Sequence, residues 1–144
     1  MGYKSPGEYV SPIGHGIVAA PATGATVYFG LGMQLLPDVS ENERKFKLPK
    51  AGRVTRIVLT FCVEGVADTA ANNVTINFMK GGADQGTVGT LTYQTVGANF
   101  LTNLAVNYPF TETDFLSIRI QYPGAWTTQP TLVSCYGVLY IETG

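Results

Sequence analysis

The chain has 144 residues, a length typical of one domain that buries about two thirds of its unfolded surface without a metal or disulfide. Charged residues make up 13% of the sequence and the formal net charge is −1, whereas a typical domain has about 25% charged residues. This composition excludes a basic surface for nucleic acid. No apolar run approaches the ~20 residues that span a bilayer, which excludes a membrane-spanning helix. Low charge is typical of a subunit that other subunits partly cover, although threonine-rich β-proteins share it.

The N-terminal segment, residues 1–25, is interrupted by proline and glycine so often that no helical or alternating period survives. It also lacks the apolar core of a signal peptide and the arginine-rich character of a transit peptide. We therefore expect synthesis in a cytoplasm without secretion. Its apolar residues are too many for a solvated linker and too scattered for a core: Tyr3, Tyr9, Val10, Ile13, Ile17 and Val18. The segment is thus predicted to be an extended docking arm that orders on a surface, and residues 26–144 to be the folded domain.

The rest of the chain alternates in the manner of β-strands. Strands are predicted over residues 26–30, 44–49, 53–65, 73–82, 89–95, 115–124 and 131–142. The pattern is clearest where Leu116, Ile118 and Ile120 alternate with polar residues. No segment has the apolar stripe of a helix, and turn residues separate the strands. The sequence therefore predicts an all-β fold, a two-sheet antiparallel jelly-roll sandwich of about eight strands.

Two of these strands are apolar on both faces. In residues 53–65, Val58 and Cys62 lie on the face opposite the main apolar set. In residues 131–142, Tyr136, Val138 and Tyr140 do the same. An isolated sandwich needs one apolar face per strand, so the second apolar face indicates burial between subunits.

Catalytic chemistry has little support in the sequence. The single histidine, His15, lies between two glycines of the predicted arm, which is a poor platform for a general base. The acid pairs Glu112 with Asp114 and Glu64 with Asp68 lack the aromatic groove of a glycosidase, and turn capping explains the first pair better. We therefore predict no enzyme, no catalytic residue, no metal site and no cofactor.

The two cysteines, Cys62 and Cys135, both lie in predicted strands. Reduced, buried thiols are favoured because no secretory signal is present, while a disulfide between the two strands stays open. The loop around Tyr122 and Trp126 also has two readings. It is either a ligand-contacting loop for a sugar or protein, or a cap in which Trp126 closes the end of the sandwich.

Several short motifs together resemble a known group of proteins. These are "TVYFGLG", the acidic link "SENERKFKLPKAG", "RVTRIVLTFCV", "NNVTINFMKGG", "TLTYQT" and "VSCYGVLYIE". Their order over residues 26–144 resembles the small trimeric, tumour necrosis factor-like jelly-roll domains of bacteriophage virion proteins. The resemblance implies a homotrimer without catalysis, in which residues of the last strand meet near the three-fold axis.

From this resemblance we expect a trimeric capsid decoration or cement protein on the exterior of a phage head. The N-terminal arm would contact the major capsid protein lattice, since no coiled coil, collagen repeat or shaft precedes the domain. The alternative is a receptor- or carbohydrate-binding head of a fibre or spike, with a host surface glycan as its ligand. The expected subunit interface comprises Tyr136, Val138, Tyr140, Arg53 and Arg56.

The stretch from Lys47 to Val63 concentrates the cations of the chain. Lys47, Lys50, Arg53 and Arg56 surround a turn at Pro49 and Gly52 that leads into a long apolar strand. Acidic residues just upstream argue against nucleic acid as the partner. We interpret the stretch as a corner of the jelly roll whose charges belong to a subunit contact.

Overall fold

The computed structural model describes residues 8–29, 44–103 and 106–143. Within these ranges, β-strands are the only elements of regular secondary structure. No helix in these ranges is long and apolar enough to cross a membrane. The strands are β1 (Glu8–Ala19), β2 (Thr26–Phe29), β3 (Gly52–Glu64), β4 (Asn73–Lys80), β5 (Ala83–Thr92), β6 (Gly97–Asn103), β7 (Tyr108–Phe110), β8 (Leu116–Gln121) and β9 (Leu132–Glu142).

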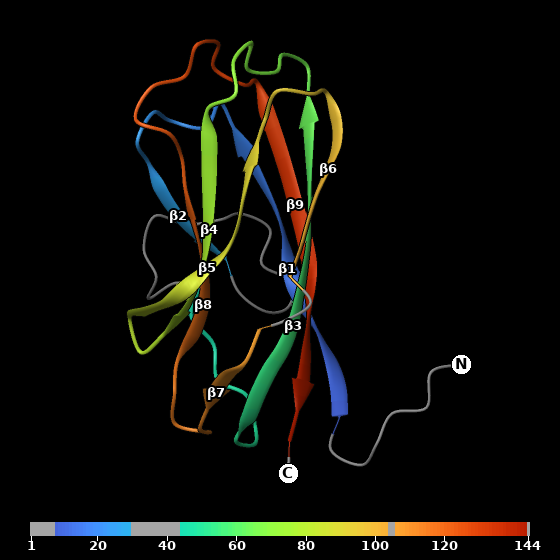
Figure 1. Cartoon of the computed structure of the whole chain (residues 1–144), viewed down its shortest axis with the longest axis vertical. Helices are drawn as coiled ribbons and strands as arrows, with labels where there is room; N and C mark the ends of the chain where they lie inside the picture. Colours follow the sequence, from blue (N-terminus) through green and yellow to red (C-terminus); the bar gives the residue numbers. More distant parts are fainter. Residues whose placement is uncertain (1–7, 30–43, 104–105, 144) are drawn as a thin grey trace, which may run out of the picture.

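The strands form two antiparallel sheets that pack face to face (Figure 1). One sheet has the order β1-β9-β3-β6, with β7 pairing a further part of β3, and the other has the order β2-β8-β4-β5. If β6 and β7 count as one interrupted strand, the first, last, third and sixth strands form one sheet. The second, seventh, fourth and fifth form the other, which is the strand order of a jelly roll. The predicted fold class is confirmed.

The core lies between the two sheets, because each strand turns its apolar set inward. In β3 the inward set is Ile57, Leu59, Phe61 and Val63, and all four are fully buried. The opposing sheet contributes Val74, Ile76, Phe78, Leu116, Ile118 and Ile120, which are also buried. The alternation that predicted the strands therefore also identified the core residues.

Within the predicted N-terminal arm, residues Glu8 to Ala19 form a strand of this chain's own sheet. β1 pairs with β9 along its length, with Glu8 opposite Glu142 and Ala19 opposite Leu132. The register shifts between Ile13 and Gly16, and this irregularity accommodates the glycines that hid the strand in the sequence. Proline is tolerated at Pro12 because β1 lies at the edge of the sheet. The folded sandwich thus begins before residue 26.

Several other strand boundaries differ from the predicted ones. Residues 44–49 form a single bridge, between Phe46 and Leu116, in place of a strand. β6 and β7 were missed because Gly97 opens β6 and Pro109 lies within β7, and both residue types usually mark loops. β5 starts earlier than expected because the turn before it is tight, with both Gly81 and Gly82 at positive φ.

A bulge in β3 decides where its two arginines lie. The register with β9 shifts between Val54 and Arg56, so that Arg53 faces Glu142 and Arg56 faces Tyr140. Residues three apart on a regular strand lie on opposite faces, but the extra residue Thr55 returns Arg56 to the face of Arg53. The bulge therefore places both cations on the outer face of the five-stranded sheet.

Candidate interaction surface

The outer side of the β3–β9 pair carries a continuous row of side chains, which we call the outer face. Neighbouring residues on the two strands pair directly across the row. The pairs are Arg53 with Glu142, Arg56 with Tyr140, Val58 with Val138, Thr60 with Tyr136, Cys62 with Ser134, and Glu64 with Leu132. The outer face is thus charged at its ends, and between them the polar Thr60 and Ser134 accompany the apolar and aromatic side chains.

Specific contacts hold the basic end of the outer face in place. The Arg53 guanidinium forms an ion pair with Glu142, with Nη2 2.9 Å from Oε1, and both side chains are about half exposed. The Arg56 guanidinium carbon lies 3.7 Å from the centroid of the Tyr140 ring, within the range of a cation–π interaction. Arg56 is therefore held over the aromatic ring of a neighbouring strand.

The middle of the outer face is partly apolar and partly accessible, although Thr60 at its centre is buried. Tyr136 is 51% exposed, which makes it one of the most exposed large hydrophobic side chains that the structure describes. Val58, Val138 and Tyr140 around it are partly exposed. The five residues predicted as a subunit interface, Arg53, Arg56, Tyr136, Val138 and Tyr140, thus come together on one surface. Their role in subunit contact stays a prediction, and Glu64 at the far end was not predicted.

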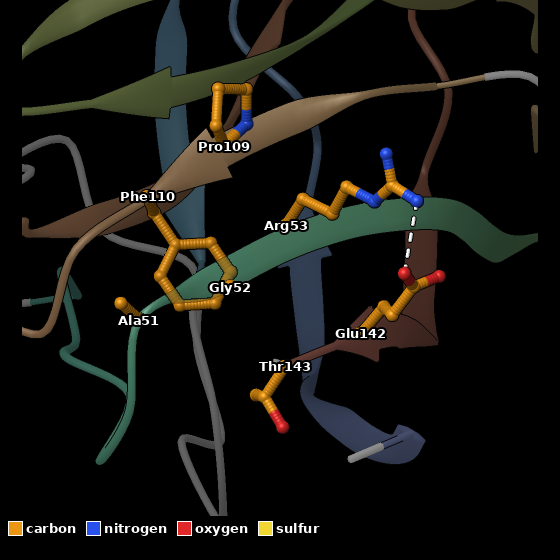
Figure 2. Close-up of a pocket in the computed structure, with 7 residues that line it drawn as sticks. All are labelled: Ala51, Gly52, Arg53, Pro109, Phe110, Glu142 and Thr143. Carbon is orange, nitrogen blue, oxygen red and sulfur yellow. Dashed lines mark hydrogen bonds and ion pairs between the residues drawn. The ribbon is translucent and has the colours of Figure 1, made fainter. Parts of the chain in front are cut away.

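A shallow pocket of about 360 Å³ adjoins the basic end of the outer face. Its lining comprises Ala51, Gly52, Arg53, Pro109, Phe110, Glu142 and Thr143. Figure 2 shows Arg53 and Glu142 reaching toward each other from β3 and β9. Because these two charges neutralise one another, the pocket presents no unpaired charge to a ligand.

The four cations of residues 47–56 do not form one patch. Arg53 and Arg56 lie on the outer face, whereas Lys47 lies elsewhere, with its Nζ 4.4 Å from the centroid of the Phe115 ring. Lys45 approaches the same ring to 4.3 Å. Lys50 is exposed in the turn before β3. The interpretation of this stretch as a corner of the jelly roll agrees with this geometry.

The predicted ligand loop is fastened to the body of the sandwich. Tyr122 is buried, and this burial raises the pKa of its hydroxyl. The nearby Cys135 raises the pKa further. The Trp126 ring stacks on Tyr93 with a centroid separation of 5.9 Å and an interplanar angle of 15°. Its Nε1 donates a hydrogen bond to the carbonyl oxygen of Pro21 at 2.8 Å. These contacts favour the second interpretation of the loop, in which Trp126 closes the end of the sandwich.

Asp68 connects three loops at the same end of the sandwich as Trp126. Its Oδ1 accepts hydrogen bonds from the amides of Thr128 (2.8 Å) and Ala70 (3.3 Å), and its Oδ2 accepts one from Nδ2 of Asn72 (2.6 Å). Its own amide donates to the carbonyl oxygen of Tyr93 at 2.9 Å. Burial alone would raise the pKa of Asp68, but these hydrogen bonds together lower it. From the sequence, Asp68 was noted only as half of an acid pair with Glu64.

A second polar cluster ties the β4–β5 hairpin to β8. Arg119 Nη2 lies 2.7 Å from Oδ2 of Asp84. Nδ2 of Asn77 donates to both carboxylate oxygens of Asp84 and to Oγ1 of Thr87, and Asn77 is 3% exposed. Sequence reasoning missed this cluster, although a polar residue such as Asn77 between the core residues Ile76 and Phe78 is the signal that could have found it.

The remaining residues weighed for chemistry lie apart. Asp114 accepts a hydrogen bond from the amide of Thr111 at 2.7 Å, which is the turn-capping role expected of it, and this bond is the main cause of its lowered pKa. His15 lies in β1. Cys62 and Cys135 form no disulfide with each other and lie on opposite faces of their sheet. Across residues 8–29, 44–103 and 106–143, no three His, Cys, Asp or Glu side chains are grouped so that they could hold a metal ion.

Comparisons with known proteins gave structural neighbours only. No family model matches the chain. A search of curated proteins also gave no match. Among solved structures, the chain is similar to one in the structure of infectious bursal disease virus Gx strain, with a TM-score of 0.45 and 14% identity over 94% of this chain and 32% of that chain. It is also similar to a chain of desmodium yellow mottle tymovirus, with a TM-score of 0.35 and 12% identity over 99% of this chain and 90% of that chain. The chain thus spans about a third of the length of the first neighbour.

Proposed function

We propose that this protein is a non-enzymatic virion structural protein that assembles with copies of itself through the outer face. The observation that carries the proposal is the row of partly exposed apolar side chains on β3 and β9, which belongs to a complete jelly-roll sandwich. Monomeric proteins seldom leave a contiguous apolar surface on a sheet uncovered, so burial by another subunit explains it. The motif resemblance supports a virion as the setting, and the trimer that it also implies stays an expectation from the sequence.

The proposed position is the exterior of a phage capsid, as a decoration or cement protein made in the host cytoplasm. The N-terminal residues, including Tyr3, are proposed to contact the major capsid protein lattice. Tyr3 lies outside the described residues. The other predicted docking residues, Tyr9, Val10, Ile13, Ile17 and Val18, all belong to β1. β1 is the last strand on its side of the sheet within the described part of the chain, and such an edge can accept a strand from another protein.

The proposal is tested on purified virus particles from the culture in which the protein is made. Quantitative mass spectrometry should find the chain at many copies per particle, and cryo-electron microscopy should place it on the outer surface of the shell. Recovery of the protein only from the particle-free supernatant would contradict the virion role.

To test the docking role of the N-terminus, only residues 1–7 are deleted, and not the whole predicted arm of residues 1–25. Because residues 8–19 form β1, removing them would damage the sandwich itself. Deletion of residues 1–7 should abolish binding to particles that lack the protein, while the melting temperature stays within about 2 °C of the intact chain. Undiminished particle binding by this variant would contradict docking through these residues.

The alternative role, a carbohydrate- or receptor-binding head, remains a weaker proposal. One face of the Trp126 ring stacks on Tyr93, and the Tyr122 ring is buried, so neither is a freely presented platform for a sugar. Replacement of Trp126 by alanine distinguishes the roles, provided that a folded fraction is assayed. Loss of glycan binding by folded protein would favour the head domain.

A further inference from the structure

We propose that two copies of this chain pack outer face to outer face about a two-fold axis that runs across the strands, so that Arg56 faces Glu64 of the partner subunit. This inference rests on the proposed self-assembly and adds the symmetry and the contacts of the same surface. It replaces the three copies that the sequence resemblance implies with an interface made by two.

The charges of the outer face define a direction along β3. Arg56 lies over the Tyr140 ring at one end. Glu64 is exposed at the other end, and the described residues include no ion-pair partner for it. Arg53 is already neutralised by Glu142. At about 3.3 Å per residue, the unneutralised cation and anion are separated by roughly 26 Å.

Thr60 lies midway between Arg56 and Glu64, four residues from each, and pairs with the exposed Tyr136. An axis in the plane of the interface, perpendicular to the strands and passing over this pair, reverses the strand direction in the second copy. Each Arg56 then faces Glu64 of the partner subunit, and the contact occurs twice. Tyr136 meets its counterpart at the axis, whereas Val58 faces Cys62 of the partner subunit and Val138 faces Ser134 of the partner subunit.

The other two-fold arrangement is electrostatically unfavourable. An axis parallel to the strands keeps their direction, so Arg56 would face Arg56 of the partner subunit and Glu64 would face its counterpart. Like charges at an interface that excludes water repel strongly. The order of charges along β3 therefore selects the antiparallel packing.

The geometry of packed sheets permits these ion pairs. Sheets that pack face to face lie about 10 Å apart and cross at about 30°. At about 13 Å from the axis, this crossing displaces facing positions by roughly 7 Å, a distance that an arginine side chain can span. The outer face, about 26 Å long and two strands wide with strands about 4.8 Å apart, covers roughly 250 Å² on each copy. The total of about 500 Å² is below the usual range of specific interfaces, so we expect a weak, reversible dimer.

A contact in which both copies use the same surface is called isologous, and it closes with two copies. Such a contact requires a self-complementary face. A three-fold ring needs two different surfaces that fit one another. Because the outer face presents its own complement when it is reversed, it does not require a second surface.

Charge reversal tests the inference in the full chain. Sedimentation velocity over a concentration series should show a monomer–dimer equilibrium for the natural sequence. Arg56→Glu and Glu64→Arg should each weaken dimerisation at least about tenfold, because each places like charges at both ends of the interface. The double variant should return to within about threefold of the natural dissociation constant. Lys50→Glu, an equal change of charge in the turn before β3, is the matched control and should leave dimerisation unchanged.

Cross-linking tests the direction of packing separately. In a Cys62→Ser background, Arg56→Cys and Glu64→Cys chains are mixed and treated with a short bis-maleimide. The mixture should yield cross-linked dimers, whereas Arg56→Cys alone should not, since its two thiols would be about 26 Å apart. Cross-linking of Arg56→Cys chains to themselves would overturn the antiparallel arrangement.

The results also separate this inference from the virion role. A monomer at all concentrations, a trimeric mass or failure of the double variant to recover would overturn the two-fold interface, whether or not the protein is found in particles. A dimer with the expected charge dependence that is absent from virus particles would uphold the interface and contradict the virion role.

Discussion

The indole nitrogen of Trp126 donates a hydrogen bond to the carbonyl oxygen of Pro21 at 2.8 Å, across 105 positions of sequence. The bond joins the loop that follows β8 to the segment between β1 and β2. Stacking of Trp126 on Tyr93 connects the same loop to the residues after β5. A single aromatic side chain thus fastens three chain segments at one end of the sandwich.

Trp126→Phe should lower the free energy of unfolding by about 1 kcal/mol, the usual net contribution of one hydrogen bond. Trp126→Ala should cost about 3 kcal/mol, because the stacking and burial are lost as well. Both are measured by urea denaturation followed by circular dichroism. Gln129→Ala is the control: its exposed side chain also donates to Pro21, at 3.1 Å, and should contribute less than about 0.5 kcal/mol. Natural stability of the Trp126→Ala variant would exclude the capping role.

Asp68→Asn should destabilise the fold by about 2 kcal/mol at neutral pH, because the carboxylate accepts hydrogen bonds from two amides and from Asn72. Glu112→Gln, an exposed acid, should change stability by less than about 0.5 kcal/mol. Urea denaturation at neutral pH compares the two variants with the natural chain.

The contribution of Asp68 should also depend on pH. Its pKa is lower in the folded state than the ordinary value of 3.8, so the folded state binds fewer protons and its advantage is present above pH 3.8. It is lost as the pH falls through the folded pKa. Melting temperatures of the natural and Asp68→Asn chains should therefore differ most at neutral pH and converge below pH 3.8. A difference that persists unchanged in acid would contradict the charged hydrogen-bond network.

Gly137→Ala should be strongly destabilising. An added Cβ would overlap the carbonyl oxygen of Val58 and Cδ2 of Leu59, and a backbone atom in a paired strand cannot easily move. We expect a loss of about 3 kcal/mol, seen as a melting temperature lower by roughly 10 °C. Gly124→Ala is the matched control, because its Cβ would meet open space, and it should melt within about 2 °C of the natural chain.

The thiols of Cys62 and Cys135 should remain separate even in oxidising buffer. Cys62 pairs across the sheet with Ser134, whereas Cys135 pairs with Phe61 on the inner side, so their Cβ atoms point to opposite faces. A thiol reagent should modify the partly exposed Cys62 in the native protein and the buried Cys135 only after denaturation. Intact mass under non-reducing conditions gives the count, and a loss of two hydrogens would show a disulfide instead.

Local sequence determined most of the fold. The alternation in residues 53–64, 73–80, 116–121 and 132–142 predicted the strands and their buried faces, because side chains of a strand point alternately to its two sides. The same pattern marked β3 and β9 as apolar on both faces, and the two strands are neighbours in one sheet. The acidic residue of a turn, Asp114, was also assigned its capping role from sequence.

Where pairing depends on distant partners, the sequence was insufficient. β1 was hidden by glycines and prolines, and only its pairing with β9 makes it a strand. The registers of long-range strand pairs depend on bulges, such as the one at Thr55. Local sequence patterns do not predict these bulges. Buried polar clusters around Asp68 and Asp84 also assemble residues from separate loops, so their members look like ordinary surface residues when read one at a time.

The sequence by itself therefore determined the class of fold, the core and the existence of a second apolar face, since these follow from side-chain periodicity within single strands. Tertiary structure alone decided that Arg53 and Arg56 share a face with Tyr136, and that Trp126 stacks on Tyr93 and donates to Pro21. Both outcomes depend on hydrogen bonds and register between residues more than 80 positions apart, because chain segments distant in sequence fix each other's geometry only when they pack.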